Sequence, residues 1–465
     1  MLQQAKQIKM VDEPKLHNQT NEEPWPSPAY SWYVVGVLTV AYTCSFIDRQ
    51  ILSLLVEPIR RDLQISDTQI SLLAGIAFTI FYTLMGVPIA KLSDQKNRKI
   101  IIAIGIATWS LMTALCGTAR NFWQLFIARI GVGVGEATLS PAAFSILADY
   151  FPVNKLARAF SVYSMGVYIG AGLAMIIGGL VVGWVANSGN VILPVIGEIR
   201  PWQTTFFIVG ILGLPVLLLM MTVKEPVRRG LGENTAGKNA SSTSELLAFI
   251  KINRRTLVCH FAAFSLTGIG IMGYLVWTPT VFIRTFGWDA PSIGMAYGTI
   301  LLVFGTAGLY AGGTVADWLQ TKGKTDAIIR SAFYSIIAAI PFAVLTPLMP
   351  TSTLAIVSLA ITTFFFSFPQ GLPAAALQVF TPNPLRAQMT AIYFLIGNLI
   401  AAGLGPTLFA LVTDYIFHDP MMIRYSIAIV SSIVLPMGAI FAFLALKPYR
   451  ESIRRAQETT NTSGA

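Results

Sequence analysis

Residues 224–245 read KEPVRRGLGENTAGKNASSTSE, a charged stretch rich in glycine, serine and asparagine that divides the chain in two. Such a composition cannot bury an apolar core, so it predicts a linker. On each side of it lie six mostly apolar runs of about 20 residues, the length that a helix needs to cross a bilayer. The sequence therefore predicts an all-α membrane protein with twelve transmembrane helices in two six-helix bundles.

The composition agrees with this division. Only 12% of the residues are charged, about half of the roughly 25% found in soluble domains. We expect the following segments: a disordered tail over 1–29, a six-helix bundle over 30–223, a linker over 224–255, a second bundle over 256–448 and a polar, frayed tail over 449–465.

The lysines and arginines predict the orientation. With the N-terminus inside, 24 of the 32 basic residues fall in cytoplasmic segments and 6 fall outside. This bias predicts that both termini are cytoplasmic, in a plasma membrane or a bacterial inner membrane. Because the basic residues lie in short clusters between apolar runs, the net charge of +10 does not indicate nucleic acid.

No pattern typical of an enzyme is present. Cys44, Cys116 and Cys259 fall inside apolar runs without ligand-like spacing, so we expect no disulfide, metal or cofactor. Intramembrane catalysis would need a nucleophile with a base or a metal cluster, and no such grouping is found. The sequence therefore favours a carrier over an enzyme.

The two halves repeat one another. AKLSDQKNRK at residues 90–99 and GGTVADWLQTKGK at 312–324 place Asp94 and Asp317 223 residues apart. The dipeptide Arg-Ala recurs at Arg158 and Arg386, 228 residues apart. Two near-equal offsets indicate pseudo-symmetric halves, the architecture of alternating-access carriers, and argue against a channel or a lipid-sensing receptor.

These motifs resemble the major facilitator superfamily. Asp94, Arg98 and Lys99 match its loop between the second and third helices, although Ala90 and Asn97 replace two glycines. LFIARIGVGVGEA at 125–137 resembles its fourth-helix motif, with an acid, Glu136, where a small apolar residue is usual.

A combination of three motifs resembles the spinster branch and its bacterial members. These motifs are FIDRQ at 46–50, RIGVGVGEA at 129–137 and GVYIGAGL at 166–173. The antiporter-like Gly-Pro is replaced by Ala174 and Met175, so antiport does not follow. The resemblance implies export or release of lysophospholipids or sphingosine-1-phosphate-like lipids, with proton coupling. We expect the carrier to be a monomer.

Four charged residues lie inside the predicted membrane runs: Asp48, Arg49, Arg129 and Glu136. A charge near the bilayer centre costs about 2.5–3.5 kcal/mol on insertion scales, so such residues need partners or a function. We hypothesise that Asp48 or Glu136 takes up a proton and loosens a salt bridge to an arginine that binds an anionic substrate. The alternative is a permanent ion pair that only joins two helices.

The repeated loop suggests a gate. Asp94, Arg98 and Lys99, with Asp317 in the second half, are expected to pair with the cytoplasmic ends of neighbouring helices and to lock the outward-facing state. The alternative is a solvated, positive-inside anchor.

Seven further residues are candidates for lining a central cavity, with ordinary helix packing as the alternative: Tyr163, Tyr168, Tyr274, Trp277, Phe368, Gln370 and Asn398. Aromatic walls suit an acyl chain. The expected partners are an amphiphilic or anionic small molecule, protons and membrane lipids. The alternative function is transport of small organic anions, sugars or drugs.

Overall fold

The computed structural model describes residues 25–186, 188–194, 197–228 and 243–463. Within them, twelve helical spans are long and apolar enough to cross a membrane, six before the linker and six after it. The predicted fold class and the number of spans are therefore confirmed. Residues 1–24 of the predicted tail over 1–29 lie outside the described residues, and so do residues 229–242 of the predicted linker.

The described residues of the N-terminal half form nine helices and two paired strands. They are α1 (Pro28–Leu54), α2 (Val56–Leu63), α3 (Asp67–Ala74), α4 (Ile76–Gln95), α5 (Arg98–Cys116), α6 (Phe122–Glu136), α7 (Leu139–Tyr150), α8 (Val153–Ala186), β1 (Val191–Leu193), β2 (Gly197–Ile199) and α9 (Pro201–Thr222). The strands pair antiparallel, with Val191 opposite Ile199.

The C-terminal half contains more broken helices. It comprises α10 (Thr243–Ile252), α11 (Arg254–Phe286), α12 (Ala290–Ile300), η1 (Leu301–Gly305), α13 (Thr306–Thr321), α14 (Ala327–Leu345), η2 (Thr346–Leu348), α15 (Ser352–Ser367), α16 (Leu372–Phe380), η3 (Asn383–Leu385), α17 (Arg386–Gly397), η4 (Asn398–Leu404), α18 (Gly405–Leu411), η5 (Val412–Phe417), η6 (Pro420–Met422) and α19 (Ile423–Ser463). Of these, η1, η4 and η5 are π-helical.

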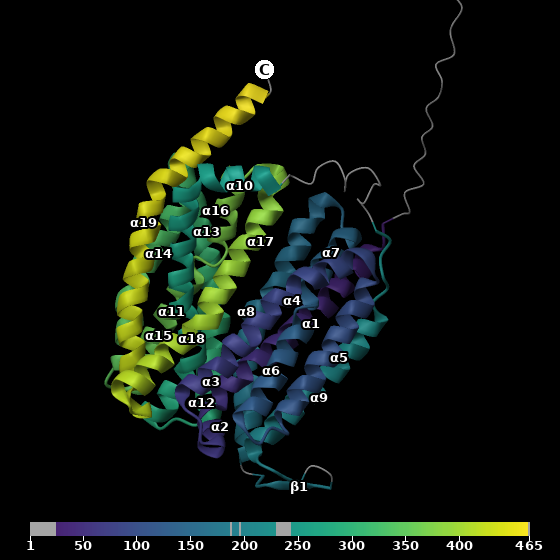
Figure 1. Cartoon of the computed structure of the whole chain (residues 1–465), viewed down its shortest axis with the longest axis vertical. Helices are drawn as coiled ribbons and strands as arrows, with labels where there is room; N and C mark the ends of the chain where they lie inside the picture. Colours follow the sequence, from purple (N-terminus) through teal and green to yellow (C-terminus); the bar gives the residue numbers. More distant parts are fainter. Residues whose placement is uncertain (1–24, 187, 195–196, 229–242, 464–465) are drawn as a thin grey trace, which may run out of the picture.

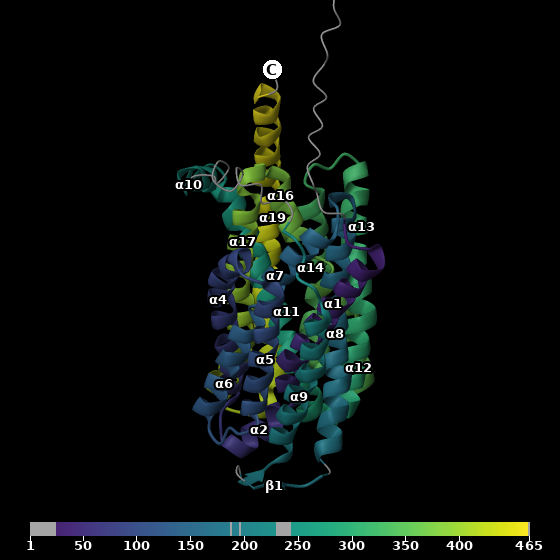
Figure 2. The same cartoon turned by 90° about the vertical axis from the view of Figure 1, so that its right-hand side faces the viewer.

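The spans lie side by side and give the molecule two ends (Figure 1). One end, which we call the hairpin end, carries the β1–β2 hairpin and the other connections that follow odd-numbered spans. The opposite end, which we call the tail end, carries α10 and the last turns of α19, and Figure 2 shows α10 projecting sideways there.

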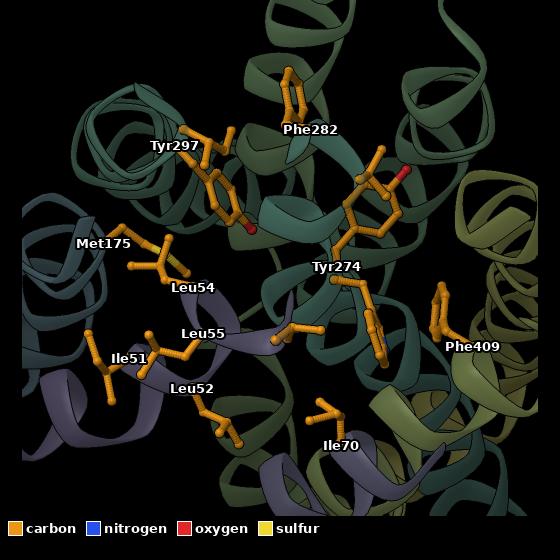
Figure 3. Packing of buried hydrophobic residues seen from close by; sticks show 14 of the residues in the cluster. Ile51, Leu52, Leu54, Leu55, Ile70, Met175, Tyr274, Phe282, Tyr297 and Phe409 are labelled. Carbon is orange, nitrogen blue, oxygen red and sulfur yellow. The ribbon is translucent and has the colours of Figure 1, made fainter. Parts of the chain in front are cut away.

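The two halves share a core only toward the hairpin end. There, Leu54 and Ile70 of the N-terminal half pack in one cluster with Tyr274, Phe282 and Tyr297 of the C-terminal half (Figure 3). Two other clusters lie nearer the tail end, one formed by residues 30–223 and one by residues 246–456. The apolar core is therefore continuous between the halves at the hairpin end and divided at the tail end.

Glycines allow close backbone contact between the halves. A Cβ on Gly75, at the break between α3 and α4, would lie 2.8 Å from the carbonyl oxygen of Gly403 in η4. A Cβ on Gly298 of α12 would lie 2.5 Å from the carbonyl oxygen of Gly172 in α8. Because neither contact leaves room for a side chain, both positions require glycine.

Two segments are more ordered than their composition predicts. α10 lies inside the predicted linker, and its Leu246, Phe249 and Ile250 pack against the core of the C-terminal half. α19 continues through the predicted frayed tail to Ser463. This helix runs through the segment from about Glu451 onward that the polar composition predicts to be frayed, because the last span propagates beyond the membrane run.

Candidate functional site

Arg49 and Glu136 form an ion pair inside the N-terminal half. The Nε of Arg49, on α1, donates to Glu136 Oε2 at 2.6 Å. The Glu136 side chain is fully buried, whereas the Arg49 side chain is 21% exposed. The other carboxylate oxygen, Oε1, is buried without a hydrogen-bond partner among the described residues. The Arg49 side chain is thus accessible in part, and Glu136 has one carboxylate oxygen that could accept a further hydrogen bond.

Aromatic rings surround the Arg49 guanidinium. Its carbon lies 4.9 Å from the ring centroid of Phe46, 4.5 Å from that of Phe78 and 4.7 Å from that of Tyr82. Cation–π attraction of this kind is worth about 0.5–2 kcal/mol per ring, more where water is excluded. The rings therefore stabilise the charge of Arg49 without using its hydrogen-bond donors.

Arg129 has a different environment from Arg49. Its side chain is buried, and its Nη1 donates to the backbone oxygen of Asp48 at 3.0 Å and its Nε to that of Leu73 at 3.5 Å. Asp48, also buried, belongs to α1, and Leu73 belongs to α3. Arg129 thus ties α6 to two neighbouring helices through carbonyl groups.

Glu136 occupies a break in the fourth span. α6 ends at Glu136 and α7 begins at Leu139, so the helix is interrupted inside the span. The preceding glycine lets α5 approach, since a Cβ on Gly135 would lie 2.7 Å from the backbone nitrogen of Trp109. Broken helices at membrane depth form substrate and ion sites in other carriers.

The loop after the second span is anchored within its own half. Arg98 is buried, with its Nη1 2.5 Å from Asp149 Oδ2 and its Nε 2.7 Å from Glu225 Oε1. Lys99 donates from its backbone nitrogen to Glu225 Oε2 at 2.9 Å and from Nζ to the Met221 oxygen at 2.7 Å. These contacts join α5 to α7, to α9 and to the start of the linker.

Asp317, the position that repeats Asp94, forms no ion pair within the described residues. Asp317 is exposed on α13. Asp94 lies in α4, and the description does not extend to its side chain. In the second half, the described ion pairs at this end include those of Asp326 with Arg330 and Arg450.

The seven cavity candidates divide by burial. Tyr163, Tyr274, Trp277 and Phe368 are buried. By contrast, Tyr168 and Asn398 are partly exposed and Gln370 is exposed. For the buried four the alternative, helix packing, fits the burial better than a place on an open wall.

Specific contacts account for three of the buried four. Tyr163 stacks on Tyr42 with ring centroids 4.8 Å apart. Trp277 Nε1 donates to the Pro406 oxygen at 2.9 Å, and the Tyr274 hydroxyl donates to the Ala343 oxygen. Tyr274 and Trp277 thus join α11 to α14 and α18.

One charged cluster was not predicted from the sequence. At the hairpin end, Arg284 of α11 donates from Nη1 and Nη2 to the two oxygens of Asp67 at 2.5 and 2.7 Å, and from Nε to Glu57 at 2.5 Å. Asp67 is fully buried, and Arg60 Nε lies 3.5 Å from it. The cluster joins the two halves across the shared core, but its members are far apart in sequence and share no motif.

A comparison of the sequence with models of known protein families identifies the family of this chain. Residues 38–406 match the model of the Major Facilitator Superfamily. The chain belongs to this superfamily. All of the relatives described below are transporters, in agreement with the expectation that the chain is not an enzyme.

Three curated relatives of this chain have names that describe different proteins. An MFS-type efflux pump of Mycolicibacterium smegmatis is 26% identical, over 92% of this chain and 95% of its own. A probable L-galactonate transporter of Escherichia coli is 24% identical, over 89% of both chains. Protein spinster homolog 1 of Xenopus tropicalis is 26% identical, over 83% of this chain and 74% of its own.

A solved structure supports the spinster resemblance. It is a bacterial homologue of the human lysosomal transporter spinster, in an inward-facing and unoccupied conformation. It is 25% identical, covers 93% of this chain and 99% of its own, and superposes with a TM-score of 0.75. The chain is therefore a multi-pass membrane transporter with relatives in the spinster branch.

Proposed function

We propose that this transporter is a proton-coupled, alternating-access carrier of an anionic amphiphile such as a lysophospholipid or a sphingosine-1-phosphate-like lipid. The observation that carries the proposal is the Arg49–Glu136 pair. It places a partly exposed guanidinium beside a buried carboxylate that has one unused oxygen. In such a pair, the guanidinium can release the carboxylate and bind a substrate anion, while the carboxylate takes up a proton.

Arg49 is the better ligand for the substrate head group. Its side chain is 21% exposed, whereas Arg129 is buried and already donates to two backbone oxygens. Guanidinium groups bind phosphate and carboxylate through paired donors. We therefore assign head-group binding to Arg49 and a positioning role to Arg129.

Glu136 is the proposed proton carrier. When its carboxylate is charged, it accepts a hydrogen bond from Arg49 and competes with a substrate anion for that guanidinium. When it is protonated, the ion pair is lost and Arg49 becomes available to the anion. Binding of the proton and of the anion should thus favour one another, and by linkage the effect is reciprocal.

The contacts between the halves indicate which state of the transport cycle this structure represents. Shared core packing and the Arg284 cluster close the hairpin end. If the tail end is cytoplasmic, as the distribution of lysine and arginine predicts, this state faces the cytoplasm. Release of the Arg284 cluster would then belong to the outward-opening step.

Substrate binding and uptake in proteoliposomes test the proposal. In the wild type, labelled lysophospholipid should be taken up saturably and should bind more tightly at lower pH, because protonation of Glu136 frees Arg49. Glu136→Gln, which mimics the protonated acid, should bind at all pH values as the wild type does at low pH, and should lose stimulation by a pH gradient. Unchanged pH dependence in this variant would remove Glu136 from coupling.

A second candidate is a carrier of soluble organic anions. The similarity to a probable L-galactonate transporter favours it, because a sugar acid also presents a carboxylate to an arginine. The same proteoliposomes distinguish the two candidates when labelled galactonate is offered. Uptake of galactonate without uptake of lysophospholipid would keep the roles of Arg49 and Glu136 but replace the substrate.

A further inference from the structure

A pocket lies on the outer side of the C-terminal half, at the tail end. It has a volume of about 890 Å³ and is bordered by the first turns of α11, the start of α14 and the later part of α19. Figure 1 shows α14 and α19 on the side of this half that faces away from the N-terminal half. We call it the lateral pocket, and it is separate from the Arg49–Glu136 pair.

Basic residues dominate the polar lining of the lateral pocket. Five basic residues line it, against one acid, Glu451: Arg254, Arg255, Arg330, Lys447 and Arg450. Two of them share the buried Asp326, since Arg330 Nη2 lies 2.8 Å and Arg450 Nε 3.6 Å from its Oδ2. Asp326 thus holds one wall of the pocket in place.

Three of the basic residues remain available to a ligand. Within the described part of the chain, Arg254, Arg255 and Lys447 make no side-chain hydrogen bond or ion pair, and all three are exposed. The pocket therefore has a positive charge that the protein itself does not neutralise. An anionic group is the ligand that complements it.

The apolar lining lies one helical turn deeper in the membrane run. Val258 follows Arg254 by four residues on α11, and Phe443 precedes Lys447 by four on α19, so each lies about 6 Å nearer the bilayer middle. Val258 is 62% exposed, Phe443 60% and Leu444 51%. A ligand that fits both layers has an anionic head and a hydrocarbon chain.

We propose that the lateral pocket binds an anionic phospholipid of the surrounding bilayer, with the phosphate among Arg254, Arg255 and Lys447 and an acyl chain along Phe443 and Val258. Basic pockets between helices at a membrane boundary recognise lipid head groups in this way. The site faces lipid rather than the path between the halves, so its ligand is a bound lipid and not the transported substrate. The inference is independent of which substrate is carried.

Lipid binding to the purified full-length protein tests the site. After delipidation, the protein is titrated with phosphatidylglycerol or with phosphatidylcholine of the same acyl chains, and bound lipid is counted by native mass spectrometry. The wild type should retain phosphatidylglycerol preferentially. Each basic residue near an anionic surface contributes about a fivefold factor, so Arg254→Gln/Arg255→Gln/Lys447→Gln should weaken that preference at least tenfold.

A matched control removes three exposed lysines at the same end of the other half. Lys91→Gln/Lys96→Gln/Lys155→Gln lowers the net charge equally but leaves the lateral pocket intact. The control should keep the preference for phosphatidylglycerol. Equal loss in both variants, an unchanged preference in the pocket variant, or equal binding of inorganic phosphate as a third ligand would each overturn the proposal.

Discussion

The two six-helix halves share an architecture but differ in the charges within their spans. The N-terminal half buries Asp48, Arg129 and Glu136 at membrane depth and exposes Arg49 only in part. In the corresponding depth of the C-terminal half, the described polar contacts are mainly hydroxyls, such as the Thr346–Ser358 pair at 2.7 Å. A duplicated fold has thus concentrated its ionic chemistry in one half.

This difference between the halves agrees with the proposed amphiphilic substrate. Charges at membrane depth are retained where they bind a ligand or an ion, because each costs several kcal/mol otherwise. The half without them can offer apolar and aromatic surfaces to a hydrocarbon chain. Under the proposed function, the N-terminal half binds the head group of the substrate and the C-terminal half binds its hydrocarbon chain.

The largest expected effect comes from removing the exposed member of the charged pair. Arg49→Gln should lower transport of an anionic substrate about a hundredfold or more, because it removes the ligand for the head group and leaves Glu136 buried without its counter-charge, a loss of about 3–5 kcal/mol. Initial uptake rates and substrate affinity in proteoliposomes measure this.

A matched variant separates charge from folding in that experiment. Arg49→Lys keeps the charge but loses the paired donors, so it should retain part of the binding. If both variants transported at the rate of the wild type, the charges of the N-terminal half would have no role in substrate binding, and the proposed difference between the halves would be wrong.

The next effect concerns the repeated loops. Arg98→Gln should lower the thermal unfolding midpoint clearly, since it removes the guanidinium that pairs with Asp149 and Glu225, a loss of about 3 kcal/mol for a buried pair. Asp317→Asn should leave the midpoint unchanged, because that side chain is exposed. Equal shifts in the two variants would show that the buried ion pairs of Arg98 contribute no more to stability than the exposed Asp317 does.

Much of the fold was predictable because bilayer physics acts locally on the sequence. Apolar runs of membrane length, the polar linker and the repeated loop motif each depend on nearby residues, so the twelve spans were found. Composition did not predict two helical segments: the part of α19 that continues beyond its membrane run, and the short amphipathic helix α10 inside a polar segment.

The candidate site was predictable only in part, for a related reason. Any charge inside an apolar run is conspicuous, so Asp48, Arg49, Arg129 and Glu136 were identified without the structure. Which arginine pairs with which acid depends on helix rotation, and the sequence left that open. The Arg284 cluster was missed because its charges lie at span ends, where they are common and carry no signal of burial.

The contact between the halves at the hairpin end gives a third prediction. Arg284→Gln should shift the equilibrium about tenfold toward separation of the halves there, because Asp67 is fully buried and, among the described residues, would keep only Arg60 as an ion-pair partner, at 3.5 Å. Spin labels on Ile192 and Ile416, exposed on opposite halves, report that distance by electron–electron double resonance.

The control for this distance measurement lies in the same cluster. Arg60→Gln removes the weaker contact with Asp67, at 3.5 Å, and should leave the distance distribution as in the wild type. Identical distributions for Arg284→Gln and the wild type would mean that core packing alone holds the hairpin end closed.

The smallest expected effect tests whether a buried aromatic serves the substrate. Tyr163→Phe removes a hydrogen bond to Ser140 that is 3.4 Å long, so it should cost about 0.5–1 kcal/mol of stability and leave the substrate KM unchanged. Tyr168→Phe is the comparison, because Tyr168 is partly exposed and faces Gly305 of the other half. A severalfold rise in KM for Tyr163→Phe alone, at unchanged stability, would place substrate inside the N-terminal core and overturn the division of roles between the halves.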